Sequence, residues 1–258
     1  MIDAHAHLSD PRLGADMILL ADQLKSLGLE RVVLGGVDPK EWLFQAKLKK
    51  ARPTFISPVV GIHPWTVRDH DESELEAMFR TLENSITGAD AIGEVGLDFH
   101  PKRTTEQLDK QSRWCLRQLE LAQRVGLPVV LHVVQGHDVM QSLLKNVSIK
   151  GALVHGFRGS SEVAKFYLAR GFVLSLGQRS FRGLEYDDYR WLPQSGFVLE
   201  SDAPPLAKDV SNINAVSHEW LKSLDEAAAF LAAMWSLSKA DVWRLAAQNL
   251  ARMIPEPY

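Results

Sequence analysis

Short runs of apolar, mostly β-branched residues alternate along the chain with longer amphipathic segments. The apolar runs are continuous and do not alternate with polar residues, which is typical of parallel strands covered on both faces. They predict strands over Ile2–His5, Arg31–Gly35, Phe55–Ile62, Ala91–Val95, Val129–His132, Ala152–His155, Phe172–Leu176 and Phe197–Ser201.

Helical patterns fill the segments between these strands. The clearest covers Thr104–Val125, where apolar residues recur at helical spacing and charges occupy the other side. Two more are predicted near the end, over Asp225–Trp235 and over Lys239–Met253, and Ser238 is placed to cap the second. Glycine follows several helical segments and precedes the next strand, as expected of a helix stop, at Gly28, Gly126 and Gly171.

This alternation predicts an α/β fold, a closed (β/α)8 TIM barrel. An open, doubly wound sheet is the alternative, because the number of strands depends on short patterns. No Ser/Gly-rich linker or change of composition divides the chain, so we expect residues 1–258 to form a single domain.

Composition limits the classes of protein that fit. The chain has 258 residues, 46% of them apolar, with 29 Lys and Arg against 32 Asp and Glu, for a formal charge of −3. A protein that coats nucleic acid without specificity is usually strongly basic, so that class is disfavoured. An enzyme that handles nucleic acid at a local site is not excluded.

The chain offers no membrane segment and no disulfide pair. Its apolar runs, such as Val129–Leu131, are far shorter than the roughly 20 residues that a spanning helix needs. The N-terminus lacks a basic region followed by an apolar stretch, so we expect no signal peptide. The one cysteine, Cys115, lies in an apolar helical stripe and is interpreted as a core residue. A cytoplasmic location without an obligate protein partner is the expectation.

Histidines and carboxylates gather where the predicted strands end. Active-site groups of a TIM barrel cluster at the carboxyl ends of its strands. Five of the nine histidines lie there, together with a glutamate that ends the fourth strand and an aspartate that follows the eighth; the set is His5, His7, His63, His132, His155, Glu94 and Asp202.

These residue types suit a divalent metal. His5 and His7 are two residues apart on a strand, so their imidazoles can meet one ion. Glu94 could bridge two ions, and His132, His155 and Asp202 could complete the coordination. We therefore predict that His5, His7, Glu94, His132, His155 and Asp202 bind one or two ions of Mg, Mn or Zn.

Other residues and chemistries fit less well. His63, in Gly61-Ile62-His63-Pro64, could orient substrate or hydrogen-bond to a metal ligand. The remaining histidines, His70, His100, His137 and His218, are interpreted as surface or loop residues. Neither a phosphate-cradling glycine loop nor a G-x-S-x-G nucleophile elbow is present, and Ser160 is interpreted as a helix N-cap.

An ordered set of motifs along nearly the whole chain resembles one known family. The matching segments are Ile2–Leu8, Gly61–Pro64, Ala91–Asp98, Leu127–His132, Val154–Phe157, Gly159-Ser160, Leu199–Pro204 and Asn249–Arg252. Together they resemble the TatD family of metal-dependent deoxyribonucleases, within the amidohydrolase-like barrel superfamily. The resemblance implies a TIM barrel with a divalent-metal hydrolase site, and its ligands fall on the six residues predicted above.

Two loops depart from the family pattern. Members often carry an Arg two residues after the histidine of the fifth strand, where this chain has Val134. They also tend to have an Arg-x-Asn-x-Pro stretch after Asp-Ala-Pro, which the segment 205–214 lacks. Other loop cations could hold phosphate in their place, namely Lys102, Arg103, Arg158, Arg179 and Arg182. Arg158 and His63 are the candidates for substrate contact or support of a metal ligand.

The sequence therefore predicts a metal-dependent deoxyribonuclease that cleaves single strands or ends of DNA with activated water. Asp202 would take or orient the proton of that water, and Glu94 would hold the ions. The alternative is a barrel hydrolase of the same superfamily acting on a small phosphodiester, an ester, a lactone or an amide. A catalytically silent binding protein that keeps the barrel is the third interpretation.

Overall fold

The computed structural model describes residues 1–100, 103–204 and 209–255. Lys102 and the stretch 205–208 lie outside these ranges. The described strands are β1 (Ile2–Ala6), β2 (Arg31–Leu34), β3 (Ile56–Ser57), β4 (Val59–Val60), β5 (Ala91–Asp98), β6 (Val129–Val134), β7 (Ala152–His155), β8 (Val173–Leu176) and β9 (Phe197–Leu199).

Except at the break between β3 and β4, each strand pairs in parallel with the next strand of the sequence. One sheet has the order β1-β2-β3 and the other the order β4-β5-β6-β7-β8-β9. Only Pro58 separates β3 from β4, and a proline cannot donate a backbone hydrogen bond to a neighbouring strand. The predicted strand over Phe55–Ile62 is therefore correct in place but is interrupted at its centre.

The segment after β9 closes the ring against β1. The backbone N–H of Asp202 donates to the carbonyl of His5 at 3.0 Å, and the N–H of His7 donates to the carbonyl of Ala203 at 2.7 Å. These bonds exclude the open-sheet alternative, and the fold is a TIM barrel.

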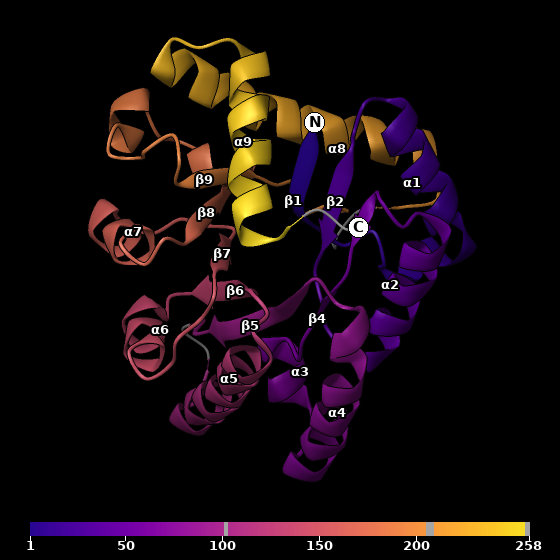
Figure 1. The fold of residues 1–258 in the computed structure, drawn as a ribbon, viewed down its shortest axis with the longest axis vertical. Coiled ribbons are helices and arrows are strands. Elements are labelled where there is room, and N and C mark those ends of the chain that lie inside the picture. The colour runs from indigo at the N-terminus through magenta and orange to yellow at the C-terminus, as the bar shows by residue number, and fades with distance from the viewer. Residues whose placement is uncertain (101–102, 205–208, 256–258) are drawn as a thin grey trace.

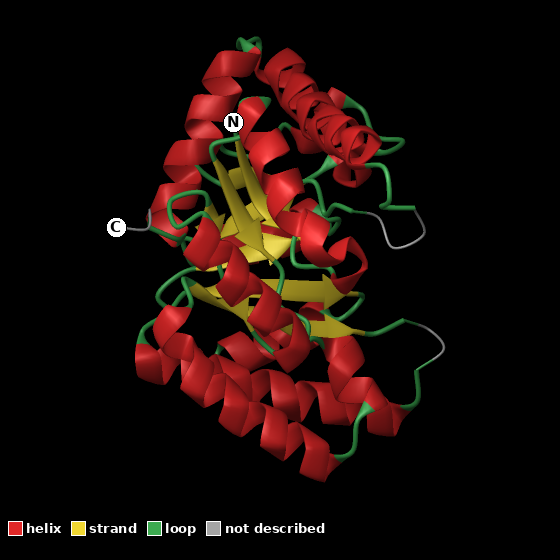
Figure 2. Ribbon diagram, turned by 90° about the vertical axis from the view of Figure 1, so that its right-hand side faces the viewer, coloured by secondary structure: helices red, strands yellow, loops and turns green. Residues whose placement is uncertain are grey.

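Helices surround the strands on the outside (Figures 1 and 2). The α-helices are α1 (Met17–Ser26), α2 (Pro39–Ala51), α3 (Pro64–Asp69), α4 (Glu72–Ser85), α5 (Thr105–Val125), α6 (His137–Leu144), α7 (Ser161–Leu168), α8 (Ile213–Trp235) and α9 (Lys239–Met253). Short 3-10 helices are η1 (Pro11–Asp16), η2 (Ile86–Gly88), η3 (Gln178–Phe181) and η4 (Tyr186–Tyr189). No helix of the described residues is long and apolar enough to cross a membrane.

The predicted helix ends are confirmed where capping side chains mark them. Thr104 and Gln107 form a capping box at the start of α5, and Gly126 ends that helix in the left-handed conformation with φ 71°. Ser160 and Ser238 cap α7 and α9 through their side chains. The predicted start of α8 at Asp225 is wrong, because the helix begins at Ile213, capped by Asn212.

Two register shifts alter the strands that carry the predicted metal ligands. Asp3 pairs with Val32 and Ala6 with Leu34, so β1 contains one extra residue across His5. The same shift occurs in β5 between Ile92 and Val95, around Glu94. β5 continues to Asp98, so the prediction that Glu94 ends its strand is wrong. A bulge turns a side chain away from the regular alternation, as is common beside active sites.

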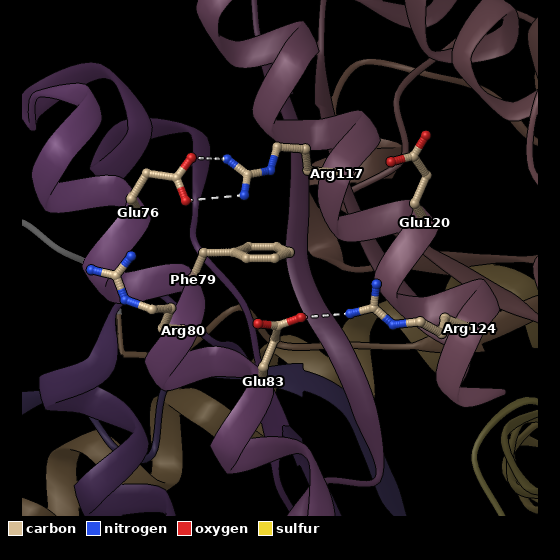
Figure 3. A pocket seen from close by; sticks show the side chains of 7 residues that line it. All are labelled: Glu76, Phe79, Arg80, Glu83, Arg117, Glu120 and Arg124. Atoms are coloured by element: carbon tan, nitrogen blue, oxygen red, sulfur yellow. Dashed lines mark hydrogen bonds and ion pairs between the residues drawn. The ribbon is translucent and has the colours of Figure 1, made fainter.

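Helices α4 and α5 pack through a charged face outside the barrel (Figure 3). Glu76 pairs with Arg117, whose guanidinium lies 4.5 Å from the centre of the Phe79 ring. Glu83 pairs with Arg124 at 2.5 Å. Positive and negative charges balance along this face, which fits a solvated packing contact between two helices.

A buried arginine ties the end of the described chain to the barrel. Arg31, at the start of β2, donates to Ser57 Oγ at 2.8 Å and to the carbonyls of Ile254 and Pro255 at 2.9 and 2.8 Å. We expect Arg31→Met to lower the free energy of unfolding by about 3 kcal/mol, because it leaves buried acceptors unpaired.

Thermal unfolding followed by circular dichroism checks this expectation. A loss of that size lowers Tm by about 6–12 °C in a domain of this length. Arg52→Met is the matched control, since Arg52 pairs with Asp22 at the surface, where solvent screens the interaction. Equal Tm values for the two variants would contradict a structural role for Arg31.

Candidate metal centre

Glu94 lies at the centre of the residues that the strand ends bring together. Its side chain is only 2% exposed. Oε1 lies 3.5 Å from Nε2 of His5 and 3.5 Å from Nε2 of His7. Oε2 lies 3.2 Å from Nδ1 of His132 and 3.8 Å from Nε2 of His155. Oε2 also lies 3.6 Å from Nε2 of His63, so the two oxygens face different imidazoles, two at Oε1 and three at Oε2, and one carboxylate could serve two ions.

Three groups of side chains have ligand atoms close enough to hold an ion. They are His5 with His7 and Glu94, His63 with Glu94 and His132, and His5 with His155 and Asp202; within each group the atoms lie within 4.8 Å of one another. All six residues predicted as ligands belong to these groups. The register that pairs His132 with His155 across β6 and β7 brings two of them side by side.

His63 joins the centre more closely than the sequence suggests. It is buried, caps α3 by accepting from the N–H of Trp65, and places Nε2 3.6 Å from Glu94 Oε2 and 3.3 Å from Nδ1 of His132. The indole of Trp65 lies beside it, with ring centres 4.8 Å apart, and donates to the carboxylate of Asp98. His63 can therefore act as a ligand itself or hold His132 in place.

Two buried carboxylates that the sequence reasoning missed support these histidines. Glu200 accepts from Gly156 N–H at 2.8 Å and lies 3.0 Å from Nδ1 of His155, which leaves Nε2 directed at Glu94. Glu41 accepts from Ser9 and lies 3.7 Å from Nδ1 of His7. A carboxylate on the outer nitrogen fixes the orientation of a ligating imidazole. Their only sequence signal is position, since Glu200 directly precedes the Ser-Asp of the last strand end.

Asp3 is a third residue that the sequence reasoning missed. It is fully buried, and Oδ2 accepts from Ser201 Oγ at 2.5 Å and from the indole N–H of Trp220 at 2.6 Å. Oδ1 accepts from the backbone N–H groups of His5 and Ser201, each at 3.1 Å. Burial raises the pKa of Asp3 to about 7, although the four donors oppose that shift. Asp3 thus fixes the strand that carries His5 against the segment that carries Asp202.

Gly35, at the end of β2, leaves the space in which three ligand side chains meet. A Cβ at this position would lie 2.6 Å from Cε1 of His7, 2.8 Å from Oε1 of Glu94 and 2.9 Å from Cε1 of His5. All three distances are shorter than van der Waals contact allows. The missing side chain is therefore part of the geometry of the centre.

The electrostatic balance keeps two of the imidazoles neutral. Burial, reinforced by neighbouring imidazoles, holds the pKa of His5 and of His63 well below the ordinary histidine value. Burial acts to raise the pKa of Glu94, but the imidazoles around it outweigh that effect and hold its pKa well below its usual range. Neutral imidazole and ionised carboxylate are the protonation states that bind metal.

The pKa shifts of His7 and His155 have the opposite direction. Burial acts to lower the pKa of His155, but Glu200 raises it to about 10. Burial likewise opposes ionisation of His7, yet hydrogen bonds to Asp202 and Glu41 raise its pKa well above the ordinary value. His7 and His155 in turn hold the pKa of Asp202 below its usual value, against the effect of burial. Asp202 is therefore ionised at neutral pH.

The buried nitrogens and oxygens of the centre fit a bound cation. Among the described residues, both ring nitrogens of His5, Oε1 of Glu94 and Nε2 of His132 are buried without a hydrogen-bond partner. A buried polar atom without a partner is costly, and a divalent ion with imidazole and carboxylate ligands would satisfy Oε1 of Glu94 and one ring nitrogen of His5. These atoms and the space left by Gly35 support a resident metal.

The predicted loop cations lie at different places. Arg179 donates to Oδ2 of Asp202 at 3.1 Å. Arg103 is 3.8 Å from Asp98, beside Trp65. Arg158 and Arg182 are exposed and form no ion pair within the described part of the chain. The structure therefore brings Arg179, and not Arg158, to the predicted ligands.

The other histidines lie apart from the predicted ligands. His100 and His218 are exposed, and His70 is half-buried with its ring nitrogen 2.9 Å from the carbonyl of Thr66. The interpretation of His137 as a surface or loop residue is wrong, because it begins α6, is half-buried and lies 3.0 Å from the hydroxyl of Tyr167.

The barrel and its cluster of histidines and carboxylates define the class of metal-dependent hydrolases. A family model described as TatD related DNase matches residues 2–255. The chain belongs to this family.

Relatives match along most of their length. The human protein named deoxyribonuclease TATDN3 is 27% identical, and the match covers 99% of this chain and 95% of that protein. A protein from Rahnella sp. named 3'-5' ssDNA/RNA exonuclease TatD is 30% identical, with 82% of each chain covered. The crystal structure of the TatD homologue YjjV from Escherichia coli superposes with a TM-score of 0.81 at 23% identity, covering 100% of this chain and 98% of the other.

Proposed function

We propose that this protein is a divalent-metal-dependent phosphodiesterase that hydrolyses single strands or ends of nucleic acid, DNA in the first place. The observation that carries the proposal is Glu94, whose Oε1 faces two imidazoles and whose Oε2 faces three others. Membership of the TatD related DNase family supports it, as does the relative named as a 3'-5' ssDNA/RNA exonuclease. We propose that residues 1–258 act as one unit.

We propose His5, His7, Glu94, His132, His155 and Asp202 as the ligands of one or two ions. His63 supports His132 or replaces it as a ligand. The mixture of imidazoles with carboxylates suits zinc or manganese better than magnesium, which prefers oxygen ligands. When bound, such an ion lowers the pKa of water and neutralises charge on phosphate oxygens.

Asp202 is the residue we propose to receive the proton of the attacking water. Its side chain is 27% exposed, whereas that of Glu94 is 2% exposed, so Asp202 is the carboxylate that substrate and solvent can reach. Oδ2 accepts from Arg179, and Oδ1, 3.6 Å from Nε2 of His7, is the oxygen that would hold the proton once His7 is the neutral imidazole that metal binding requires. Glu94 stays ionised and keeps the two groups of histidines together.

Hydrolysis of an uncharged ester, lactone or amide is the second candidate. It is favoured by Val134, which is exposed where an arginine would suit a phosphate, and by the lack of arginine in the segment 205–214. A cytoplasmic location is proposed on the single cysteine, Cys115, which is buried and free.

The proposed function is tested by removing metal from the protein with a chelator, adding Zn, Mn or Mg, and then adding labelled substrates. The substrates are single-stranded DNA, double-stranded DNA, RNA and a panel of carboxylic esters. We expect hydrolysis of single-stranded DNA that chelation removes and that zinc or manganese restores. Hydrolysis of esters alone would favour the second candidate, and no hydrolysis with any metal would favour a silent barrel.

A further inference from the structure

Arg179 lies in η3, the short 3-10 helix that follows β8, and its neighbours hold this turn in place. Within η3, the residues on either side of Arg179 are anchored: Gln178 donates to Glu226, and the carbonyl of Ser180 accepts from the hydroxyl of Tyr189 at 2.9 Å. Phe181 stacks on Phe230 with ring centres 4.2 Å apart. The backbone of Arg179 is therefore fixed by its neighbours.

The guanidinium of Arg179 reaches into the metal centre from the solvent side. Its NH1 donates to Oδ2 of Asp202 at 3.1 Å, and its side chain is 67% exposed. Among the described residues, no other lysine or arginine forms an ion pair with a proposed metal ligand. The remaining N–H groups of the guanidinium stay available to a further acceptor beside Asp202.

An anionic substrate needs such a group here. The centre contains Glu94 and Asp202, with Glu41 and Glu200 behind them, and these carboxylates repel a phosphate wherever bound ions do not offset them. The protein as a whole carries a formal charge of −3, so it offers no general attraction for a polyanion. An uncharged ester would gain nothing from a cation at this place.

We propose that Arg179 binds the phosphate of the substrate beside Asp202 and so selects phosphodiesters over uncharged esters. This inference rests on the proposed function and names the group that recognises its substrate. The planar fork of the guanidinium can hold two phosphate oxygens while the side chain stays within reach of Asp202. Of the five loop cations that the sequence offers for phosphate, Arg179 is therefore the one we assign to this contact.

Kinetics of Arg179→Gln on a short single-stranded oligonucleotide test the proposal. We expect KM to rise about tenfold or more, because a charge-assisted hydrogen bond to substrate is lost, with a smaller change in kcat. Arg179→Lys keeps the charge and is expected to recover most of the affinity. Arg124→Gln is the matched control, since it removes an equally exposed, carboxylate-paired arginine from the α4–α5 face and should leave KM unchanged (Figure 3).

Equilibrium binding gives a measurement that does not depend on turnover. Anisotropy of a labelled oligonucleotide, titrated with chelated protein between 50 and 200 mM salt, reports the salt dependence of Kd. Loss of one phosphate contact is expected to reduce the slope of log K against log salt by about 0.7.

Unchanged KM and an unchanged salt slope in Arg179→Gln would overturn the proposal. So would a fall in kcat alone, because that result means that Arg179 acts only through Asp202. If the wild-type protein hydrolyses only uncharged esters, the proposed function fails. The slope of log K against log salt for oligonucleotide binding then decides by itself whether Arg179 contacts phosphate.

Discussion

Glu94→Gln is expected to lower kcat/KM on single-stranded DNA by about a thousandfold while the barrel stays folded. Glutamine keeps the size of the side chain but removes the charge that the imidazoles on both sides of Glu94 face. Losing an ion, or its position, forfeits several kcal/mol of transition-state stabilisation, and about 4 kcal/mol corresponds to a thousandfold in rate.

Three measurements separate this effect from a loss of structure. Circular dichroism of Glu94→Gln should match the wild type, and elemental analysis should find less bound metal. Glu83→Gln is the matched control, because Glu83 lies in an ion pair with Arg124 on the outer helices and should leave activity unchanged (Figure 3). Full activity in Glu94→Gln would show that Glu94 is not at the reacting centre.

Gly35→Ala is expected to lower activity about a hundredfold by adding one methyl group. The new Cβ would press on His5, His7 and Glu94 at distances of 2.6–2.9 Å, so these side chains must move apart. A displacement of about 1 Å in a catalytic site can cost about a hundredfold in rate, and disturbed support of metal ligands costs about 10- to 100-fold in metal affinity.

Titration of the chelated protein with zinc measures this loss of affinity directly. Gly88→Ala is the matched control, because a Cβ at Gly88 meets no heavy atom within 4 Å. Overpacking in Gly35→Ala is expected to lower the free energy of unfolding by about 1–3 kcal/mol, which leaves the protein folded at 25 °C. Equal zinc affinity in both variants would contradict the role assigned to the empty space at Gly35.

Local pattern was enough to place most elements, and it failed where a distant contact decided the outcome. The helix α5 was predicted within one residue at its start, because its capping box and its final glycine are encoded within the helix and its flanks. The apolar pattern places the start of α8 twelve residues too late, because the first turns of the helix bury the polar Ser217 beside Val216 and Trp220. The bulges at His5 and Glu94 left no recognised signal, since a register shift is defined only by the neighbouring strand.

The residues of the candidate metal centre also fall into two groups, those that local pattern predicts and those that only distant contacts define. The proposed ligands follow strands in the sequence, and parallel strands carry their carboxyl ends to one side, so a single chain suffices to predict that they meet. Asp3 and Trp220 are 217 residues apart, and Glu200 meets His155 across 45 residues. Such contacts cannot be predicted from spacing, because they depend on how the barrel closes.

The sequence by itself determined the class of fold, the residues that gather at one end of the barrel and the chemistry they favour. Strand and helix periods, caps and strand-end histidines are local properties, so they can be read from short stretches of the sequence without knowledge of the fold. The tertiary structure alone decided that Glu94 faces two groups of imidazoles, that Gly35 leaves room for them and that Arg179, and not Arg158, reaches Asp202. These features depend on distances of a few ångströms between separate segments, and closure of the barrel sets those distances.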